Sequence, residues 1–311
     1  MATLICGSFA YDTIMVFGDK FKNHILPDQV HILNVCFVAP ELRREFGGCA
    51  GNIAYNLKLL GGEPLPMGTV GNDFDAYAAW LDECGINRRH VTTLSDCYTA
   101  QAYITTDLDD NQITAFHPGA MSHAHMNRIS DAAGVELGIV SPDGREAMIE
   151  HAAQFAAAGI PFVFDPGQGL PMFDGEELLR FVEQASYVTV NDYESQLLQE
   201  RTRRSLGALA AKVEALVVTK GAHGSEIHVD GSVIAVPAAS VSQAVDPTGC
   251  GDAYRAGLLY GLTAGKDWEE TGRIASLCGA MKIESHGTQN HRFTTDEFAE
   301  RLAQEYGASF A

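Results

Sequence analysis

Short apolar runs that alternate with helix-forming stretches constrain the fold of this chain more than any other feature. The runs end near Gly, Asp, Asn or Pro, are too short for helices, and cover residues 3–6, 64–70, 137–140, 161–164, 187–190 and 216–219. Stretches rich in Ala, Leu and Glu with helical spacing lie between them, as at 145–158 and 176–185. The alternation predicts an α/β fold with a mostly parallel sheet covered by helices on both faces.

Two segments, 30–46 and 98–117, interrupt this alternation because neither has helical spacing. In the second, a β-rich run on each side of the polar turn 107–111 indicates a hairpin. We interpret the two segments as a small antiparallel sheet, a lid formed by about residues 13–46 and 98–118 of a single domain spanning 1–311. The acidic residues of the turn, interpreted as a solvated hairpin tip, are Asp107, Asp109 and Asp110. After the lid, the chain ends in predicted helices at 251–263, 268–283 and 295–306.

The charge balance limits the partners that this chain can bind. It has 21 Lys and Arg against 40 Asp and Glu, a net charge of −19, which repels nucleic acid and anionic membranes. The 7 cysteines are scattered without a Cys-x-x-Cys pair, as in a reducing cytosol. No signal peptide or long apolar span is evident. We therefore expect a cytoplasmic protein that binds small molecules, as a monomer or a homodimer.

The most informative stretch is DPTGCGD at 246–252, which precedes an apolar helix. Small residues there would let the amides of Gly249, Cys250 and Gly251 converge on an anion at the helix N-terminus. The carboxylate of Asp252 could then accept a proton from a hydroxyl that attacks a phosphoryl group. The alternative is structural, because Asp favours the first turn of any helix and glycines often form only a tight turn.

This stretch resembles, almost residue for residue, the signature near the C-terminus of the ribokinase-like (PfkB) carbohydrate kinases, and the resemblance extends over essentially the whole chain. It implies a ribokinase-like three-layer α/β sandwich with a β-sheet lid and an ATP-dependent phosphotransferase activity. In that family the final Asp is the base, here Asp252, and the preceding amides form the anion hole.

Two N-terminal runs carry the substrate half of the resemblance, GSFAYD at 7–12 and FGGCAGNIA at 46–54. The resemblance implies that Asp12 accepts hydrogen bonds from two vicinal hydroxyls, that Gly48 lets a sugar approach the backbone, and that Asn52 binds sugar hydroxyls. The alternatives are a solvated turn Asp and a glycine turn with a capping Asn. The substrate-binding residues predicted in this way are Ser8, Asp12, Gly47, Gly48, Asn52 and Phe116.

The nucleotide half of the resemblance lies downstream. Asn191 and Glu194 resemble an Asn-x-x-Glu element that organises Mg²⁺ and phosphate largely through water, although the same spacing is that of a capping box. The run TKGAHG at 219–224 resembles a loop that lies against ATP, with Thr219, Gly221 and Gly224 as its binding residues. The resemblance also implies K⁺ beside Asp246, and it suggests that residues 285–290 flank the adenine and cation sites.

The presumed lid indicates which substrate is bound. It offers apolar and aromatic side chains with few cations, which suits a nucleoside base better than a free sugar or a phosphosugar: Phe37, Val38, Tyr103 and Phe116. Details of the motifs are similar to bacterial adenosine and nucleoside kinases. We therefore expect phosphorylation of the 5′-hydroxyl of a ribonucleoside, with adenosine favoured. The alternatives are a ribokinase- or fructokinase-like sugar kinase and a metabolite-binding relative without turnover.

Five further residues have roles that the resemblance does not assign. The sequence departs from the family pattern at Pro247 and Cys250, and a thiol at a helix N-terminus could have a lowered pKa and be open to oxidation. Arg255 could assist the transfer or lie exposed on its helix. His123 and His125 are spaced for one face of a strand, but without a third ligand we do not interpret them as a metal site.

Overall fold

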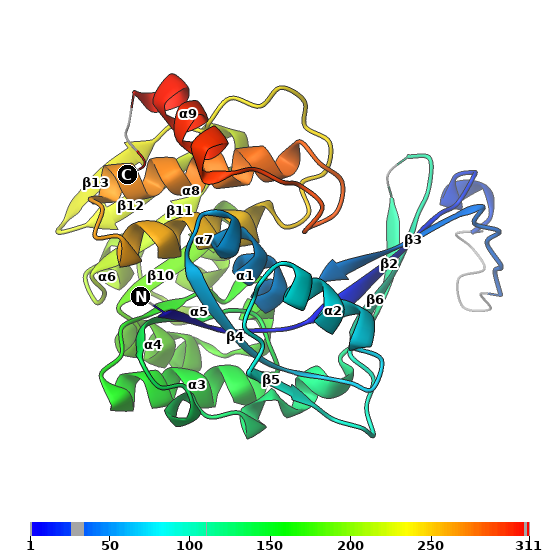
Figure 1. Cartoon of the computed structure of the whole chain (residues 1–311), viewed down its shortest axis with the longest axis horizontal. Coiled ribbons are helices and arrows are strands. Elements are labelled where there is room, and N and C mark those ends of the chain that lie inside the picture. Colours follow the sequence, from blue (N-terminus) through cyan, green and yellow to red (C-terminus); the bar gives the residue numbers. More distant parts are fainter. Residues whose placement is uncertain (1, 26–33, 110, 308–309, 311) are drawn as a thin grey trace.

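A computed structural model of the chain describes residues 2–25, 34–109, 111–307 and 310. Within them, the strands form a nine-stranded sheet and a separate four-stranded sheet, which projects from the body of the molecule (Figure 1). Residues 26–33 of the predicted lid and Asp110 of the predicted turn lie outside the described residues. Among those described, no helix is long and apolar enough to cross a membrane.

The large sheet has the order β13-β12-β11-β10-β9-β8-β1-β4-β5. Its parallel strands are β1 (Ala2–Cys6), β4 (Glu63–Val70), β5 (His90–Thr93), β8 (Val135–Val140), β9 (Phe162–Phe164), β10 (Tyr187–Asn191) and β11 (Ala215–Thr219). Two antiparallel strands, β12 (Ser225–Val229) and β13 (Ser232–Val236), complete one edge. The six predicted strands are therefore confirmed, as is the mostly parallel sheet.

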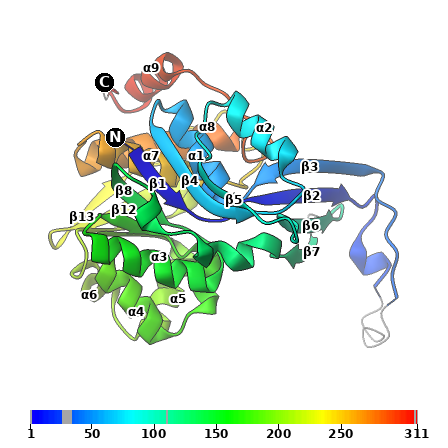
Figure 2. The ribbon, with the colours of Figure 1, turned by 60° about the horizontal axis from the view of Figure 1, so that its bottom comes forward.

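Helices cover both faces of this sheet (Figure 2). One face carries α1 (Cys49–Leu59), α2 (Asp75–Glu83), α7 (Cys250–Thr263) and α8 (Trp268–Ile283), with α9 (Thr295–Tyr306) packed on α8. The other carries α3 (Arg145–Ala158), α4 (Gly175–Gln184), α5 (Asp192–Thr202) and α6 (Leu206–Ala210). The predicted helices are confirmed, with identical bounds for α3, α8 and α9.

Each inner strand contributes to two hydrophobic cores because successive side chains point to opposite faces of the sheet. Leu4 and Leu216 pack among the residues of α3, α4 and α5, whereas Ile5 and Val217 pack against α1 and α7. All four side chains are fully buried. A strand buried on both faces must be apolar throughout, which explains why these strands appear in the sequence as continuous apolar runs.

The smaller sheet has the order β3-β2-β6-β7 and is formed by β2 (Ala10–Val16), β3 (Glu41–Gly47), β6 (Ala100–Thr106) and β7 (Gln112–His117). The predicted hairpin is confirmed as β6 and β7. The prediction of a purely antiparallel sheet was wrong, because β2 and β6 are parallel. The reason is topological. Both β2 and β6 run outward from the body of the molecule, whereas β3, which is antiparallel to β2, runs back toward it.

The prediction of a solvated hairpin tip was wrong for Asp107, which is buried. Its carboxylate accepts hydrogen bonds from the backbone N–H groups of Phe21 at 2.8 Å, Asp109 at 2.9 Å and Asn111 at 2.9 Å. A polar side chain that satisfies several backbone donors is favoured inside a turn. Asp107 therefore joins the hairpin to η1, a 3₁₀ helix at Phe21–Asn23.

The remaining short elements are 3₁₀ helices that connect the main strands and helices. They are η3 (Gly119–Met126), η4 (Ile129–Asp131), η5 (Gly167–Met172) and η6 (Gly221–His223). Three of the α-helices, α4, α5 and α9, begin with a capping box in which the N-cap residue, just before the helix, and the N3 glutamate exchange hydrogen bonds.

Candidate active site

A cavity of about 830 Å³ lies at the carboxyl ends of the parallel strands, next to the lid. Side chains that follow five of these strands line it: Ser8 after β1, Asp143 after β8, Asp165 after β9, Asn191 at the end of β10 and Thr219 at the end of β11. Parallel strands deliver all such residues to one edge of the sheet, which is where open α/β sheets bind ligands.

Most of the residues predicted from the sequence meet in this cavity. Those that line it are Ser8, Asp12, Gly48, Asn52, Phe116, Asn191, Glu194, Thr219, Gly221, Gly249, Gly251 and Asp252. The remaining predicted residues do not line it: Gly47 at the end of β3, Gly224 before β12, Asp246 in the loop before α7, and Cys250 at the start of α7.

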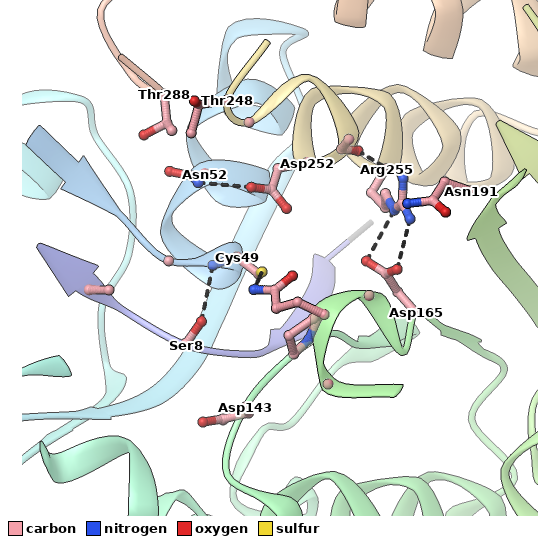
Figure 3. Close-up of a pocket in the computed structure, with 18 of the residues that line it drawn as sticks. Ser8, Cys49, Asn52, Asp143, Asp165, Asn191, Thr248, Asp252, Arg255 and Thr288 are labelled. Carbon is pink, nitrogen blue, oxygen red and sulfur yellow. Dashed lines mark hydrogen bonds and ion pairs between the residues drawn. The ribbon is translucent and has the colours of Figure 1, made fainter. Parts of the chain in front are cut away.

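Asp252 is the third residue of α7 and faces α1 across the cavity (Figure 3). Its Oδ2 accepts a hydrogen bond of 2.8 Å from the side-chain amide of Asn52. Loss of water around the carboxylate raises the pKa of Asp252 to about 6, against a lowering by the Asn52 bond. A carboxylate with a pKa just below neutrality is ionised at physiological pH and still basic enough to accept a proton.

The partner of Asp252 is itself fixed by a chain of hydrogen bonds. Asn52 Oδ1 accepts from Gln289 Nε2 at 2.9 Å, and Gln289 Oε1 accepts from Trp80 Nε1 at 2.9 Å. These bonds orient the Asn52 amide so that its N–H points at the carboxylate. The sequence predicted that Asn52 binds sugar hydroxyls, and the structure adds that it positions Asp252.

The loop before α7 offers backbone donors beside Asp252. Gly249 caps the helix with a φ of 79°, a conformation that favours glycine. Within the described part of the chain, the amides of Gly249 and Gly251 have no protein acceptor, whereas the Cys250 amide donates to Pro247 O at 3.2 Å. Two donors at a helix N-terminus therefore remain free to bind an anion.

The predicted lowering of the Cys250 pKa was wrong. Burial raises the pKa of the thiol to about 11, and this outweighs the attraction of Lys282. The thiol is therefore protonated at neutral pH and poorly reactive toward oxidants.

Arg255 lines the cavity, and the alternative that it lies exposed on its helix was wrong. Its side chain is buried and pairs in a fork with Asp165, through Nε to Oδ2 at 3.0 Å and Nη2 to Oδ1 at 2.9 Å. Glu194 lies 3.9 Å from the same guanidinium. Buried charges need such pairing, so Arg255 fixes the carboxylates at the β9 and β10 end of the cavity.

Asn191 and Glu194 have the structural role that the sequence left open, and they also lie at the cavity. They form a capping box, in which Asn191 Oδ1 accepts from Glu194 N at 2.7 Å and Glu194 Oε2 accepts from Asn191 N at 2.8 Å. Both also line the cavity, next to Asp192. Burial, with a further contribution from Asp165, raises the pKa of Glu194. The cap thus holds an acidic group at the cavity wall.

The opposite end of the cavity is built around Asp12. Burial, together with the charges of Glu45 and Asp246, raises the pKa of Asp12 to about 6. Gly47 leaves room for this carboxylate, because a Cβ there would lie 2.5 Å from Asp12 Oδ2. Gly48 has a φ of 87°, and its Cβ would lie 2.5 Å from Ser8 O. Both glycines are therefore needed where β3 crosses the connection between β1 and β2.

Comparison with known proteins identifies this arrangement. The sequence profile of the pfkB family of carbohydrate kinases matches residues 12–295. The chain belongs to this family. A nucleoside kinase of Methanocaldococcus jannaschii is 32% identical over 272 residues, which cover 86% of this chain and 89% of the relative.

Two solved structures of a nucleoside kinase from Burkholderia thailandensis have the same fold as this pfkB family kinase. The complex with inosine is 49% identical, covers 99% of both chains and has a TM-score of 0.90. The complex with ADP-inosine is 51% identical, covers 99% of this chain and 97% of the other, and has a TM-score of 0.88. The ribokinase-like fold predicted from the motifs is thus confirmed.

The lid of this pfkB family kinase contributes less to the cavity than predicted. Phe116 lines it, together with Ala102. Phe37 instead packs against Phe17, with ring centroids 4.8 Å apart, and Val38 is 78% exposed. The hydroxyl of Tyr103 donates to Gln101 within the lid, at 2.7 Å. The lid therefore has an apolar cluster of its own.

Several cavity residues were missed by the sequence reasoning. They are Asp143, Asp165, Gln168 and Met172, with Met121 from η3. The available signal was position, because Asp165 directly follows the predicted strand 161–164 and Asp143 lies three residues after the predicted strand 137–140. Asp143 is buried, and its Oδ2 has no hydrogen-bond partner in the described structure.

The other predicted residues of this pfkB family kinase have structural surroundings. Gly224 has a φ of 83°, and a Cβ there would lie 2.1 Å from Val236 O, so it allows β12 to pass close to β13. Asp246 accepts from the amides of Thr248 and Gly287, each at 2.9 Å. His123 and His125 lie on η3 and not on a strand, which corrects that interpretation.

Proposed function

We propose that this pfkB family member is a nucleoside kinase, which transfers the γ-phosphoryl group of ATP to the 5′-hydroxyl of a purine ribonucleoside, adenosine in particular. The observation that supports this most is the position of Asp252, which lines the cavity beside the free amides of Gly249 and Gly251. The same cavity is lined by Asp12 from the lid strand β2, which could bind hydroxyls, and by Asn191 and Thr219 from β10 and β11.

The proposed reaction follows from the arrangement of these residues in the cavity. The ribose is held by Asp12 and by the backbone at Gly48, so that its 5′-hydroxyl reaches Asp252, which accepts the proton. The amides of Gly249 and Gly251 stabilise the charge on the transferring phosphoryl group, at about 10²–10³-fold per donor. A lid over the nucleoside would exclude water that could otherwise attack ATP.

A nucleoside suits the cavity better than a free sugar does. Apolar side chains that could contact a base line part of the wall: Phe116, Met121 and Met172. The relatives from Methanocaldococcus and Burkholderia are nucleoside kinases, and the Burkholderia protein binds inosine. Inosine therefore joins adenosine as a substrate to be tested.

Mg²⁺ suits the phosphate end of the cavity. Asp165, Asp192 and Glu194 line it, and oxygen ligands, many of them waters, are what Mg²⁺ prefers. Among the described residues, no three His, Cys, Asp or Glu side chains converge on one point, so the ion would be held largely by ATP and water. When bound, Mg²⁺ would neutralise phosphate charge.

K⁺ does not suit the loop of Asp246. Both carboxylate oxygens accept backbone N–H groups, and the backbone oxygen accepts from a lysine ammonium, Lys282 Nζ, at 2.6 Å. A second cation would have to compete with this ammonium for the same oxygen.

The experiment is to measure ATP consumption with Mg²⁺ for adenosine, inosine, guanosine, cytidine, ribose and fructose, using the wild type and Asp252→Asn. We expect turnover with purine nucleosides that is lost in the variant. Turnover with ribose or fructose alone would refute the nucleoside assignment. If no compound is phosphorylated but adenosine still raises the melting temperature, the protein binds the metabolite without turnover.

A further inference from the structure

Lys282, near the end of α8, is an unusual residue for its position, because its side chain is completely buried. Its ammonium donates to the backbone oxygen of Asp246 at 2.6 Å and to that of Ser285 at 3.4 Å. Lysine is almost never fully buried without a partner. Here the partners are two backbone oxygens from different segments, so the ammonium lies where those segments meet.

The two segments joined by Lys282 carry the anion-binding loop and one wall of the cavity. The first runs from Val245 to Gly251, and the second from Ile283 to Thr288. Three backbone N–H groups support the junction: those of Val245 and Asp246 donate to Ile283 O, and that of Gly287 donates to the side-chain Oδ2 of Asp246. The position of the Gly249 and Gly251 amides therefore depends on how this junction is held.

The charges that face Lys282 act on its ammonium in both directions. Burial lowers the pKa of Lys282 and Arg43 adds to that lowering, whereas the carboxylates of Asp246 and Asp252, which lie close by, oppose it. The Cys250 thiol, which also faces Lys282, is protonated, as described above. The Lys282 ammonium is thus surrounded by backbone oxygens, with carboxylates nearby. Proteins bind K⁺ in surroundings of the same kind.

We infer that the Lys282 ammonium is a built-in replacement for a monovalent cation, which holds the anion-binding loop in place so that the activity needs no K⁺. Lys282 is then a positioning residue, because it lies on the far side of the Asp246 backbone and does not line the cavity. This inference rests on the proposed function only for its kinetic test.

The kinetic test compares the wild type with Lys282→Met, which keeps the length of the side chain and removes the charge. Nucleoside-dependent ATP consumption is measured in choline chloride and in KCl at equal ionic strength. The wild type should change less than about twofold between the salts, and Lys282→Met should lose at least about tenfold in kcat, with a smaller change in the KM for nucleoside. Addition of K⁺ or NH₄⁺ should restore part of the lost kcat.

Lys212→Met serves as the matched control, because Lys212 forms an exposed ion pair with Glu183 far from the cavity. Its rate should equal that of the wild type in both salts. A lysine that only stabilises the fold would leave Lys282→Met less stable, but K⁺ and NH₄⁺ would not rescue its kcat. This lack of rescue would overturn the inference, as would a wild type that K⁺ stimulates tenfold.

A binding test does not depend on turnover and separates a failure of this inference from a failure of the proposed function. The melting temperature is measured for both proteins in KCl and in choline chloride. The wild type should melt at the same temperature in both salts, whereas Lys282→Met should melt higher in KCl. A K⁺-specific rise in the wild type would show a vacant cation site and refute the inference. If Lys282→Met does not fold, Lys282→Gln replaces it in both tests.

Discussion

The two cavity carboxylates with raised pKa values, Asp12 and Asp252, give a quantitative prediction for pH dependence. Each has a pKa of about 6 because it is shielded from water. In the proposed mechanism, Asp252 must be ionised to accept a proton, and Asp12 must be ionised to accept hydrogen bonds from both ribose hydroxyls. Protonation of either group should therefore abolish productive binding or transfer.

The magnitude follows from these pKa values. For two independent groups of pKa about 6, kcat/KM should fall about 100-fold between about pH 7.5 and about pH 5, against about tenfold for one group. Asp12→Asn should show the shallower profile and a KM for nucleoside raised about 10–100-fold, the cost of hydrogen bonds to a charged group. Asp252→Asn should lose about 10²–10⁴-fold in kcat.

The assay measures initial rates with saturating Mg²⁺ and ATP and varied adenosine, between about pH 5 and about pH 7.5, so that Asp143, with a pKa of about 8, stays protonated. kcat/KM reports the free enzyme, to which these pKa values belong. Asn52→Ala, which removes the hydrogen bond to Asp252, should move the acid limb to higher pH. A wild-type kcat for Asp252→Asn, or a flat profile down to pH 5, would refute the assignment of the base.

Two further predictions concern stability. Arg255→Met should lower the free energy of unfolding by about 3–5 kcal/mol, because it leaves the buried Asp165 carboxylate unpaired, whereas Lys212→Met at an exposed pair should cost less than about 1 kcal/mol. Urea denaturation measures both, and equal losses would contradict the pairing. Burial raises the pKa of Asp143 to about 8, so the folded state keeps a proton that the unfolded state releases, and stability should fall as pH rises toward that value. The free energy of unfolding of the wild type should therefore fall by about 1.4 kcal/mol per pH unit more than that of Asp143→Asn between about pH 5 and pH 7, and parallel curves would disprove the shift.

The sequence was sufficient for the fold of the main body because the rules that it obeys are local. A strand buried on both faces must be continuously apolar, and the six predicted strands follow this rule. The signature at 246–252 likewise placed Asp252 and the amides of Gly249 and Gly251 in one turn, since neighbours in sequence at a helix start are neighbours in space. Their meeting with Asp12 and Asn52 came from the family resemblance.

Tertiary structure alone decided the interactions between distant segments. Nothing near Arg255 in the sequence indicates its pairing with Asp165, ninety residues away, or the burial that makes the pairing necessary. The same holds for Lys282, which resembles any helix-terminal lysine until the fold closes around it and brings Asp246 O within reach. The sequence therefore determined the strands, the helices and the turn at 246–252 through local periodicity and spacing. The charge pairs that hold the site in place depend instead on which distant segments the folded sheet brings together.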